Sequence, residues 1–140
     1  MIITGMQGAG KTTACNYLSE KWGKRSLFFP EEKMTNIDDY RNQLVEFSKS
    51  NDIVDLAIGE ASAIRLLELK CTIVLIKAEK LIRIDRIAKR NYKTRIEIQS
   101  SYDKVWRGIE RSQDAMNPDI TITNNSTIEN YYEELNKLCL

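Results

Sequence analysis

The segment that most constrains the fold of this chain is a glycine-rich octapeptide close to its first residue. It reads G-M-Q-G-A-G-K-T, from Gly5 to Thr12, and it matches the pattern G-x-x-x-x-G-K-[S/T] at every fixed position. The pattern is informative only between a strand and a helix. Here the apolar segment 2–4 precedes it, and apolar residues at helical spacing follow it as far as Trp22. The octapeptide therefore predicts a strand–loop–helix unit that binds phosphate.

The residue types of this loop indicate how it would hold a nucleoside triphosphate. Its glycines let the backbone wrap closely, so that consecutive N–H groups can point at phosphate oxygens. The helix that begins near Gly10 adds unpaired N–H groups and a partial positive charge. Lys11 would bridge the outer phosphates, and the Thr12 hydroxyl would ligate magnesium, so we expect ATP and Mg²⁺ as ligands. The predicted contact residues are Gly5, Gln7, Gly8, Ala9, Gly10, Lys11, Thr12 and Thr13.

Short apolar runs alternate with amphipathic helical segments along the whole chain. Such alternation is typical of βαβ units, which form a parallel sheet covered by helices on both faces. We therefore predict an α/β fold, the P-loop NTPase fold, with a five-stranded parallel sheet between helices. The predicted strands are 2–4, 26–29, 52–58, 72–76 and 119–123, and the predicted helices are 10–22, 37–49, 61–69, 80–90, 96–116 and 127–138.

Length and composition narrow the class of protein. A chain of 140 residues suits one domain, 1–140, and 21 basic residues nearly balance 20 acidic ones. Whole-surface attraction to nucleic acid or to an anionic membrane is therefore not expected. The chain has no histidine, and its three cysteines form no CxxC pair. The apolar run 73–76 is too short to cross a bilayer. These features predict a cytoplasmic protein without a disulfide framework.

The helical segment 80–90 carries three arginines, Arg83, Arg86 and Arg90, at positions i, i+3 and i+7. They could form a set aimed at phosphates or at an adenine ring. They could also form a solvated basic face, with Ile84 and Ile87 on the opposite, apolar face. Spacing alone favours the solvated face, because charged helix residues are usually exposed.

Three stretches of the chain, in order, carry a family resemblance: GMQGAGKTT, VLIKAEKLIRIDRIAKR and NPDITITNNSTIENYYEEL. They resemble the landmarks of small P-loop kinases, in particular nucleoside monophosphate kinases and dephospho-CoA kinases, including archaeal dephospho-CoA kinase-like proteins. Those proteins have an R-x-x-x-R helix after a strand, then a lid, then a D-x-x-I-x-N strand before a helix capped by serine or threonine. The correspondence covers most of the chain apart from residues 25–50.

The resemblance implies that the protein transfers the terminal phosphoryl group of ATP to a small nucleotide-like acceptor, such as a nucleoside monophosphate or dephospho-CoA. Lys11, Arg86 and Arg90 would then be catalytic residues, with the two arginines contacting phosphates or adenine. The segment 119–124 would lie beside the nucleotide base.

The resemblance also implies a lid at about 90–112 and an acceptor region at about 30–50. Arginines of the lid could close over the phosphates; the candidates are Arg95, Arg107 and Arg111. The acceptor region is short, and only Arg41 stands out in it.

Kinases of this kind carry an acidic residue near the phosphate loop that holds the metal or activates the acceptor. Asp55, in the predicted strand 52–58, is the first candidate for both roles, because a buried carboxylate is costly unless it is paired or bound to a metal. If the strand is instead 56–58, Asp55 merely stands at its start. Glu60 is the second candidate, and Glu31, with its neighbour Glu32, is the third.

Two further functions remain open. A catalytically reduced relative could bind ATP as a structural ligand and act as an interaction module with a protein partner. A kinase for the 5′-hydroxyl of a polynucleotide is less favoured, because the chain is nearly neutral, although a basic stretch covers 89–95. A signalling GTPase is not expected, since the guanine-reading N-K-x-D motif is missing. Tyr131 and Tyr132 receive no role, because aromatic residues at helical positions are more often part of the core.

Overall fold

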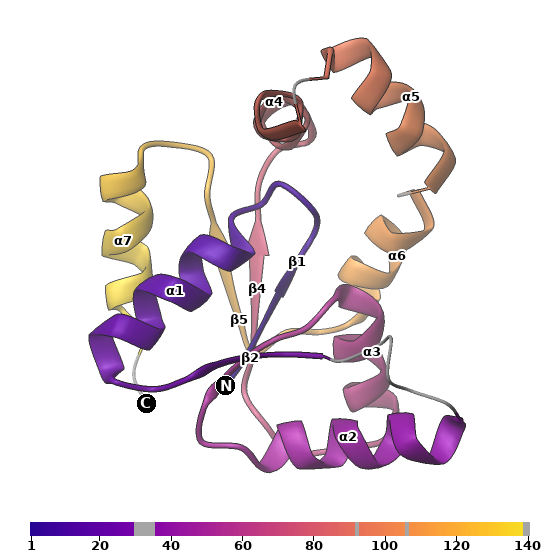
Figure 1. The fold of residues 1–140 in the computed structure, drawn as a ribbon, viewed down its shortest axis with the longest axis vertical. Helices are drawn as coiled ribbons and strands as arrows, with labels where there is room; N and C mark the ends of the chain where they lie inside the picture. Colours follow the sequence, from indigo (N-terminus) through magenta and orange to yellow (C-terminus); the bar gives the residue numbers. More distant parts are fainter. Residues whose placement is uncertain (30–35, 92, 106, 139–140) are drawn as a thin grey trace.

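A computed structural model describes residues 1–29, 36–91, 93–105 and 107–138. These residues form one parallel sheet in the order β2-β3-β1-β4-β5, with helices on both faces (Figure 1). The predicted fold class is therefore confirmed. The strands are β1 (Ile2–Gly5), β2 (Ser26–Phe28), β3 (Ile53–Asp55), β4 (Ile73–Lys77) and β5 (Ile120–Thr123). The helices are α1 (Lys11–Trp22), α2 (Ile37–Lys49), α3 (Ile58–Leu66), α4 (Lys80–Asn91), α5 (Arg95–Val105), α6 (Arg107–Ala115) and α7 (Ile128–Asn136).

β1 lies at the centre of the sheet, between β3 and β4, and every one of its residues is buried. Its Cα partners in β4 run from Ile73, opposite Ile2, to Ile76, opposite Gly5. Parallel strands covered on both faces are expected to be apolar throughout, which explains why the runs of β1 and β4 were recognisable in the sequence. The loop after Gly5 consequently starts at the carboxyl edge of the sheet, where parallel α/β folds place their ligands.

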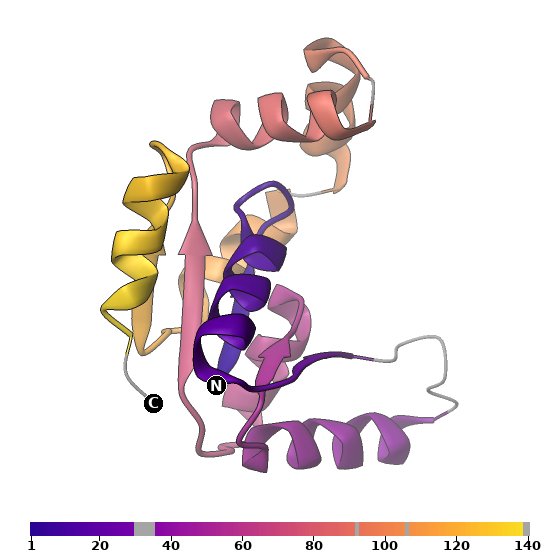
Figure 2. The ribbon, with the colours of Figure 1, turned by 60° about the vertical axis from the view of Figure 1, so that its left-hand side comes forward.

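Alternate strand residues pack on opposite layers of helices. Ile3 faces α1 and α7, in a cluster that includes Leu18 and Leu135. Ile2 faces the other layer, in a cluster that includes Leu44 of α2 and Ile64 of α3. Figures 1 and 2 show α2 across the amino end of the strands, so it lies at the end of the sheet opposite the glycine-rich loop.

Three predicted elements differ from the observed ones by three residues or more; one is the predicted helix 61–69, which is α3 and begins three residues earlier. The predicted strand 52–58 is only β3, because Ala57 is the extended residue from which α3 already begins at Ile58. The predicted helix 96–116 is two helices, α5 and α6. α5 packs through Ile98 on α4, whereas α6 packs on α3. One straight helix could not reach both neighbours.

Several helix ends follow their predicted signals. α1 stops at Gly23, whose φ of 61° is in the left-handed region that glycine adopts easily. The side chain of Thr127 caps α7 by accepting a hydrogen bond from the Asn130 N–H at 3.2 Å. Within the described ranges, no helix combines the length and the apolar character needed to cross a membrane.

Candidate nucleotide-binding site

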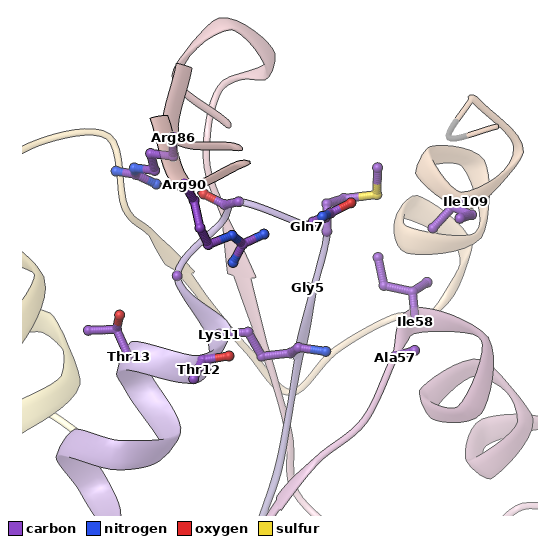
Figure 3. Close-up of a pocket in the computed structure, with 13 residues that line it drawn as sticks. Gly5, Gln7, Lys11, Thr12, Thr13, Ala57, Ile58, Arg86, Arg90 and Ile109 are labelled. Atoms are coloured by element: carbon purple, nitrogen blue, oxygen red, sulfur yellow. Dashed lines mark hydrogen bonds between the residues drawn. The ribbon is translucent and has the colours of Figure 1, made fainter. Parts of the chain in front are cut away.

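A cavity of about 450 Å³ opens at the carboxyl edge of the sheet, beside the glycine-rich loop (Figure 3). All but one of the predicted contact residues line it: Gly5, Gln7, Gly8, Gly10, Lys11, Thr12 and Thr13. The exception is Ala9, which is fully buried behind the loop in the cluster around Ile3. The opposite wall is formed by Ala57 and Ile58 at the start of α3, and by Ile109 of α6. The loop thus forms one side of the cavity, and apolar side chains form the other.

Two loop glycines occupy positions that no other residue could take without strain. Gly8 and Gly10 have φ values of 82° and 105°, in the left-handed region. A Cβ on Gly8 would lie 2.7 Å from the Arg83 carbonyl oxygen of α4, and one on Gly10 would lie 2.5 Å from the Asn124 amide nitrogen. The pattern therefore reflects close packing of α4 and of the chain after β5 on the loop, in addition to any need of a ligand.

Lys11 lies at the base of the cavity. Its ammonium group is 2.9 Å from Asp55 Oδ1 and donates a 3.4 Å hydrogen bond to the carbonyl oxygen of Leu56. The Asp55 side chain is only 6% exposed, whereas the Lys11 side chain is 24% exposed. Asp55 ends β3, where the strand meets the carboxyl edge of the sheet. The sequence thus brings together the predicted lysine and the first-choice carboxylate, as an ion pair next to the loop.

The other two carboxylate candidates stand differently. Glu60 is buried in the first turn of α3 and does not line the cavity. Glu31 and Glu32 lie outside the described residues. Thr12 does line the cavity. The roles of Asp55 and Thr12 toward a metal stay predictions. In the described part of the chain, no cluster of three or more Asp, Glu, Cys or His side chains suited to a metal occurs.

The prediction of a solvated face on α4 was wrong for Arg83 and Arg86, whereas Arg90 is exposed. Arg83 is 4% exposed; it donates to the Ala78 carbonyl oxygen at 2.9 Å and pairs with Glu110 of α6 at 3.3 Å. Arg86 is partly buried over the loop, and Arg90 lines the cavity while remaining exposed. The reason is that the loop packs on this side of α4 and Glu110 of α6 reaches Arg83, which spacing along one helix cannot reveal.

Arg86 is bound to the backbone of the loop. Its Nη1 donates to the carbonyl oxygens of Gly8, at 3.1 Å, and Ala9, at 3.4 Å, and its Nη2 donates to that of Asn124 at 2.8 Å. Burial lowers the pKa of this guanidinium, but an arginine remains charged at neutral pH. Arg86 therefore places a positive charge beside the loop in a fixed orientation.

The arginines predicted to belong to the lid do not reach the cavity. Arg95, at the start of α5, binds Asp85 on the outer side of α4, with its Nη2 2.7 Å from Oδ1. Arg107 and Arg111 are exposed on α6 and are not among the residues that line the cavity. The hydrogen bonds to Arg95, and the neighbouring charge of Lys89, lower the pKa of the Asp85 carboxyl.

The segment 119–124 spans the full height of the sheet, so only one of its ends can lie near the loop. Asp119 precedes β5 at the amino edge, where it accepts hydrogen bonds from the Ile73 N–H and from Arg65, both at 2.8 Å. Asn124 follows β5 at the carboxyl edge and donates from Nδ2 to the Ala9 carbonyl oxygen at 2.8 Å. Asp119 is thus a structural residue far from the loop.

Comparison with known proteins fits this geometry. Residues 1–107, more than half of the chain, match a family model described as an AAA domain. The chain belongs to this AAA domain family. No curated protein matches it in sequence.

Solved structures share the fold of this AAA domain at low sequence identity. Shikimate kinase from Bacteroides thetaiotaomicron superimposes with a TM-score of 0.71 at 12% identity, over 97% of this chain and 93% of that chain. Shikimate kinase from Acinetobacter baumannii, solved in complex with shikimate, gives 0.60 at 16% identity, over 99% and 94%. Dephospho-CoA kinase from Campylobacter jejuni gives 0.54 at 12% identity, over 97% and 92%. The fold is therefore that of P-loop kinases.

Some residues at the site of the AAA domain were not predicted. The apolar wall of Ala57, Ile58 and Ile109 could have been found in part, since the first two follow a strand directly and must lie at the carboxyl edge. Ile109 gave no such signal, because its place depends on how α6 packs on α3. Tyr131 received no role, yet its hydroxyl donates to the Gly10 carbonyl oxygen at 2.7 Å.

The thiol of Cys15, in α1 of the AAA domain, is expected to be inert in the folded protein. It is 1% exposed, and burial, reinforced by the Asp55 carboxylate, raises the pKa of the thiol to about 12. Since the thiolate is the reactive form, iodoacetamide should modify Cys15 only after unfolding. Mass spectrometry of peptides from native and denatured protein tests this, with half-buried Cys71 as the internal comparison. Rapid modification of Cys15 in the native protein would contradict the expectation.

Proposed function

We propose that the protein is an ATP-dependent phosphotransferase that moves the terminal phosphoryl group of ATP to a small, nucleotide-like acceptor. The observation that carries the proposal is the position of Lys11, in a cavity between the complete phosphate loop and an apolar wall that can receive a second molecule. The AAA domain family and the kinases that share the fold support the same class of reaction.

The loop side of the cavity supplies what phosphates require. The loop N–H groups and the start of α1 favour an anion, and Lys11 stands at the base of the cavity. Arg90 extends from α4 into the same cavity, and among the described residues none forms an ion pair with it. Arg90 is therefore available for the outer phosphates, where a guanidinium can neutralise the charge that develops during transfer.

The adenine base has a place on the other side of Arg86. A second cavity of about 430 Å³ lies between α4 and the chain after β5. Its lining combines apolar, charged and polar side chains: Leu81, Ile82, Asp85, Arg86 and Lys89 of α4, Arg95 of α5, and Asn125 and Ser126. The edge of the Arg86 guanidinium is occupied by backbone carbonyls, which leaves its flat face for stacking on a base. Arg86 thus links the proposed base site to the phosphate loop.

Magnesium fits the side chains beside the loop. It prefers oxygen ligands and usually binds through one or two protein groups plus phosphates and water, and the Thr12 hydroxyl and the Asp55 carboxylate are such groups. When bound, the ion would neutralise charge on the phosphates. Asp55 is held by Lys11 in this structure, so we infer that Lys11 exchanges this carboxylate for phosphate oxygens when nucleotide binds.

The acceptor would lie between the phosphates and the apolar wall. Ala57, Ile58 and Ile109 offer contact to a ring or a hydrocarbon face rather than to a charge. We propose a nucleoside monophosphate or a dephospho-CoA-like molecule, whose base or pantetheine portion would use this surface. The kinases with the same fold act on chemically different acceptors, so shikimate belongs in the same test.

The test is acceptor-dependent conversion of ATP to ADP. Purified protein with ATP and Mg²⁺ is given nucleoside and deoxynucleoside monophosphates, dephospho-CoA, shikimate and a 5′-hydroxyl oligonucleotide, each in turn, and the phosphorylated product is identified by mass spectrometry. One acceptor should raise ADP formation well above the rate without acceptor, and EDTA should abolish the difference. If no acceptor of the panel is phosphorylated, the proposed transfer to these classes fails.

A second candidate, an ATP-binding interaction module, has two observations in its favour. α2, which the resemblance would place at the acceptor, lies at the end of the sheet opposite the loop (Figure 1). Arg95 is paired with Asp85 and does not line the loop cavity. If this is the function, the unfolding temperature should rise with the concentration of ATP, and no acceptor should raise the rate of ATP turnover.

A further inference from the structure

Three consecutive carbonyl oxygens of the phosphate loop are held from outside by side chains of other elements. The Gly8 oxygen accepts from Arg86, and the Ala9 oxygen accepts from Arg86 and Asn124. The Gly10 oxygen accepts from the Tyr131 hydroxyl and, in the first turn of α1, from the Ala14 N–H at 3.0 Å. The donors come from α4, from the chain after β5 and from α7. Residues outside the loop therefore help to orient the whole loop backbone from Gly8 to Gly10.

Fixing these oxygens also fixes the N–H groups of the same peptide units. In a trans peptide the C=O and the following N–H point in opposite directions, and the described residues contain no cis peptide. Because the Ala9 and Gly10 oxygens are turned outward, the N–H groups of Gly10 and Lys11 are turned toward the cavity. The Ala9 N–H instead bonds to the Met6 oxygen at 3.1 Å, within the loop itself.

Like Asn124, Tyr131 does not line the loop cavity, so it cannot act there by touching the ligand. Its side chain is 2% exposed, it lies behind the loop in the cluster with Leu18 and Leu135, and it does not line the loop cavity. Burial raises the pKa of its hydroxyl, which therefore stays protonated and remains a donor at physiological pH. Its ring also lies 3.1 Å from the position of a Cβ on Gly10, so the contact is close as well as polar.

We propose that Tyr131 is a positioning residue that, together with Asn124, holds the phosphate loop in its anion-binding form before any nucleotide arrives. The inference rests on one part of the proposed function, namely that the loop binds a polyphosphate. A loop already in its binding form loses little conformational freedom on binding, so affinity is gained without any contact to the ligand. Without the Tyr131 hydroxyl, the Gly10 oxygen would keep only its bond from the Ala14 N–H, so the Lys11 N–H of the same peptide unit would be held less firmly toward the anion.

The experiment compares Tyr131→Phe with Tyr132→Phe by titration calorimetry. Both substitutions remove one hydroxyl from α7, but Tyr132 stacks on Tyr17 and is not bonded to the loop. Inorganic tripolyphosphate, ATP with Mg²⁺, and adenosine are the three probes. Tyr131→Phe should weaken binding of the first two by about threefold to tenfold, the effect expected for one hydrogen bond, and should leave adenosine unchanged. Tyr132→Phe should bind all three like the wild type.

The possible results separate the inference from the proposed function. If the wild type binds neither tripolyphosphate nor ATP, the proposed function falls, and this inference falls with it. If the wild type binds both and Tyr131→Phe binds them equally well, only the inference is overturned, even if the variant unfolds at a lower temperature. If Tyr131→Phe does not fold, the affinity of Asn124→Ala for tripolyphosphate is measured instead. This probe has no base, so a change at the base site cannot affect the result. Unchanged affinity there would likewise overturn the inference.

Discussion

Replacing Lys11 with alanine is expected to lower phosphoryl transfer from ATP by about a thousandfold or more, because the phosphate loop then has no charged side chain beneath the transferred group. Lys11 is the only charged residue between Gly5 and Thr12, and it lies in the cavity. The measurement is the rate of phosphorylated product formation with the acceptor identified in the panel. Lys49→Ala, at the exposed end of α2, removes an equal charge far from the loop and should keep the wild-type rate.

Loss of activity in Lys11→Ala has to be separated from loss of stability. The substitution leaves the Asp55 carboxylate, which is 6% exposed, without its partner. We expect this to lower the free energy of unfolding by about 1–3 kcal/mol, less than for a fully buried pair because Lys11 is partly in water. The double variant Lys11→Met/Asp55→Asn removes both charges and should recover stability but not transfer. If its activity returned together with its stability, a catalytic role for Lys11 would be wrong.

The fold could be predicted from the sequence because local patterns determine it. The apolar runs of β1 and β4 and the glycine at the end of α1 each act within a few residues. The loop pattern needs only a strand before it and a helix after it, and both are visible in the sequence. Asp55 was predicted inside a strand 52–58, and only the structure shows that β3 ends at this residue, which places it at the carboxyl edge of the sheet.

The surroundings of the loop could not be predicted, because they depend on residues far apart in the sequence. Tyr131 and Asn124 bind loop oxygens across separations of 121 and 115 residues. Tyr131 lies in no recognised motif, and Asn124, which ends the D-x-x-I-x-N segment, was expected beside the nucleotide base rather than on the loop backbone. Arg83 illustrates the same limit. Helical spacing placed it correctly on a polar face, but only the packing of α6, which brings Glu110 to it, shows that this face is covered. The position of Arg95 on Asp85 likewise depends on the turn between α4 and α5.

Replacing Asp55 with asparagine is expected to uncouple nucleotide binding from magnesium. In the wild type, ATP without metal must take Lys11 away from Asp55, whereas a metal ion can use the carboxylate that Lys11 releases. The asparagine side chain keeps the shape of aspartate but not its charge. Lys11 can then bind phosphate without first breaking an ion pair. The metal loses either a direct ligand or a carboxylate that holds one of its ligands. Binding of ATP in EDTA should become tighter, and the gain in affinity on adding Mg²⁺ should shrink by about tenfold to a hundredfold.

Calorimetric titration of wild type and Asp55→Asn with ATP, in Mg²⁺ and in EDTA, measures both quantities without any need for turnover. Asp38→Asn, an exposed position in the first turn of α2, is the matched control and should show the wild-type dependence on metal. The affinity for ATP in EDTA and the gain in affinity on adding Mg²⁺ test separate roles of Asp55. Tighter binding in EDTA with an unchanged response to Mg²⁺ would leave Asp55 as the partner of Lys11 alone. The metal ligand would then have to be sought at Glu60 or at Glu31, which lies outside the described residues, and Glu31 would be the better choice because Glu60 does not face the cavity.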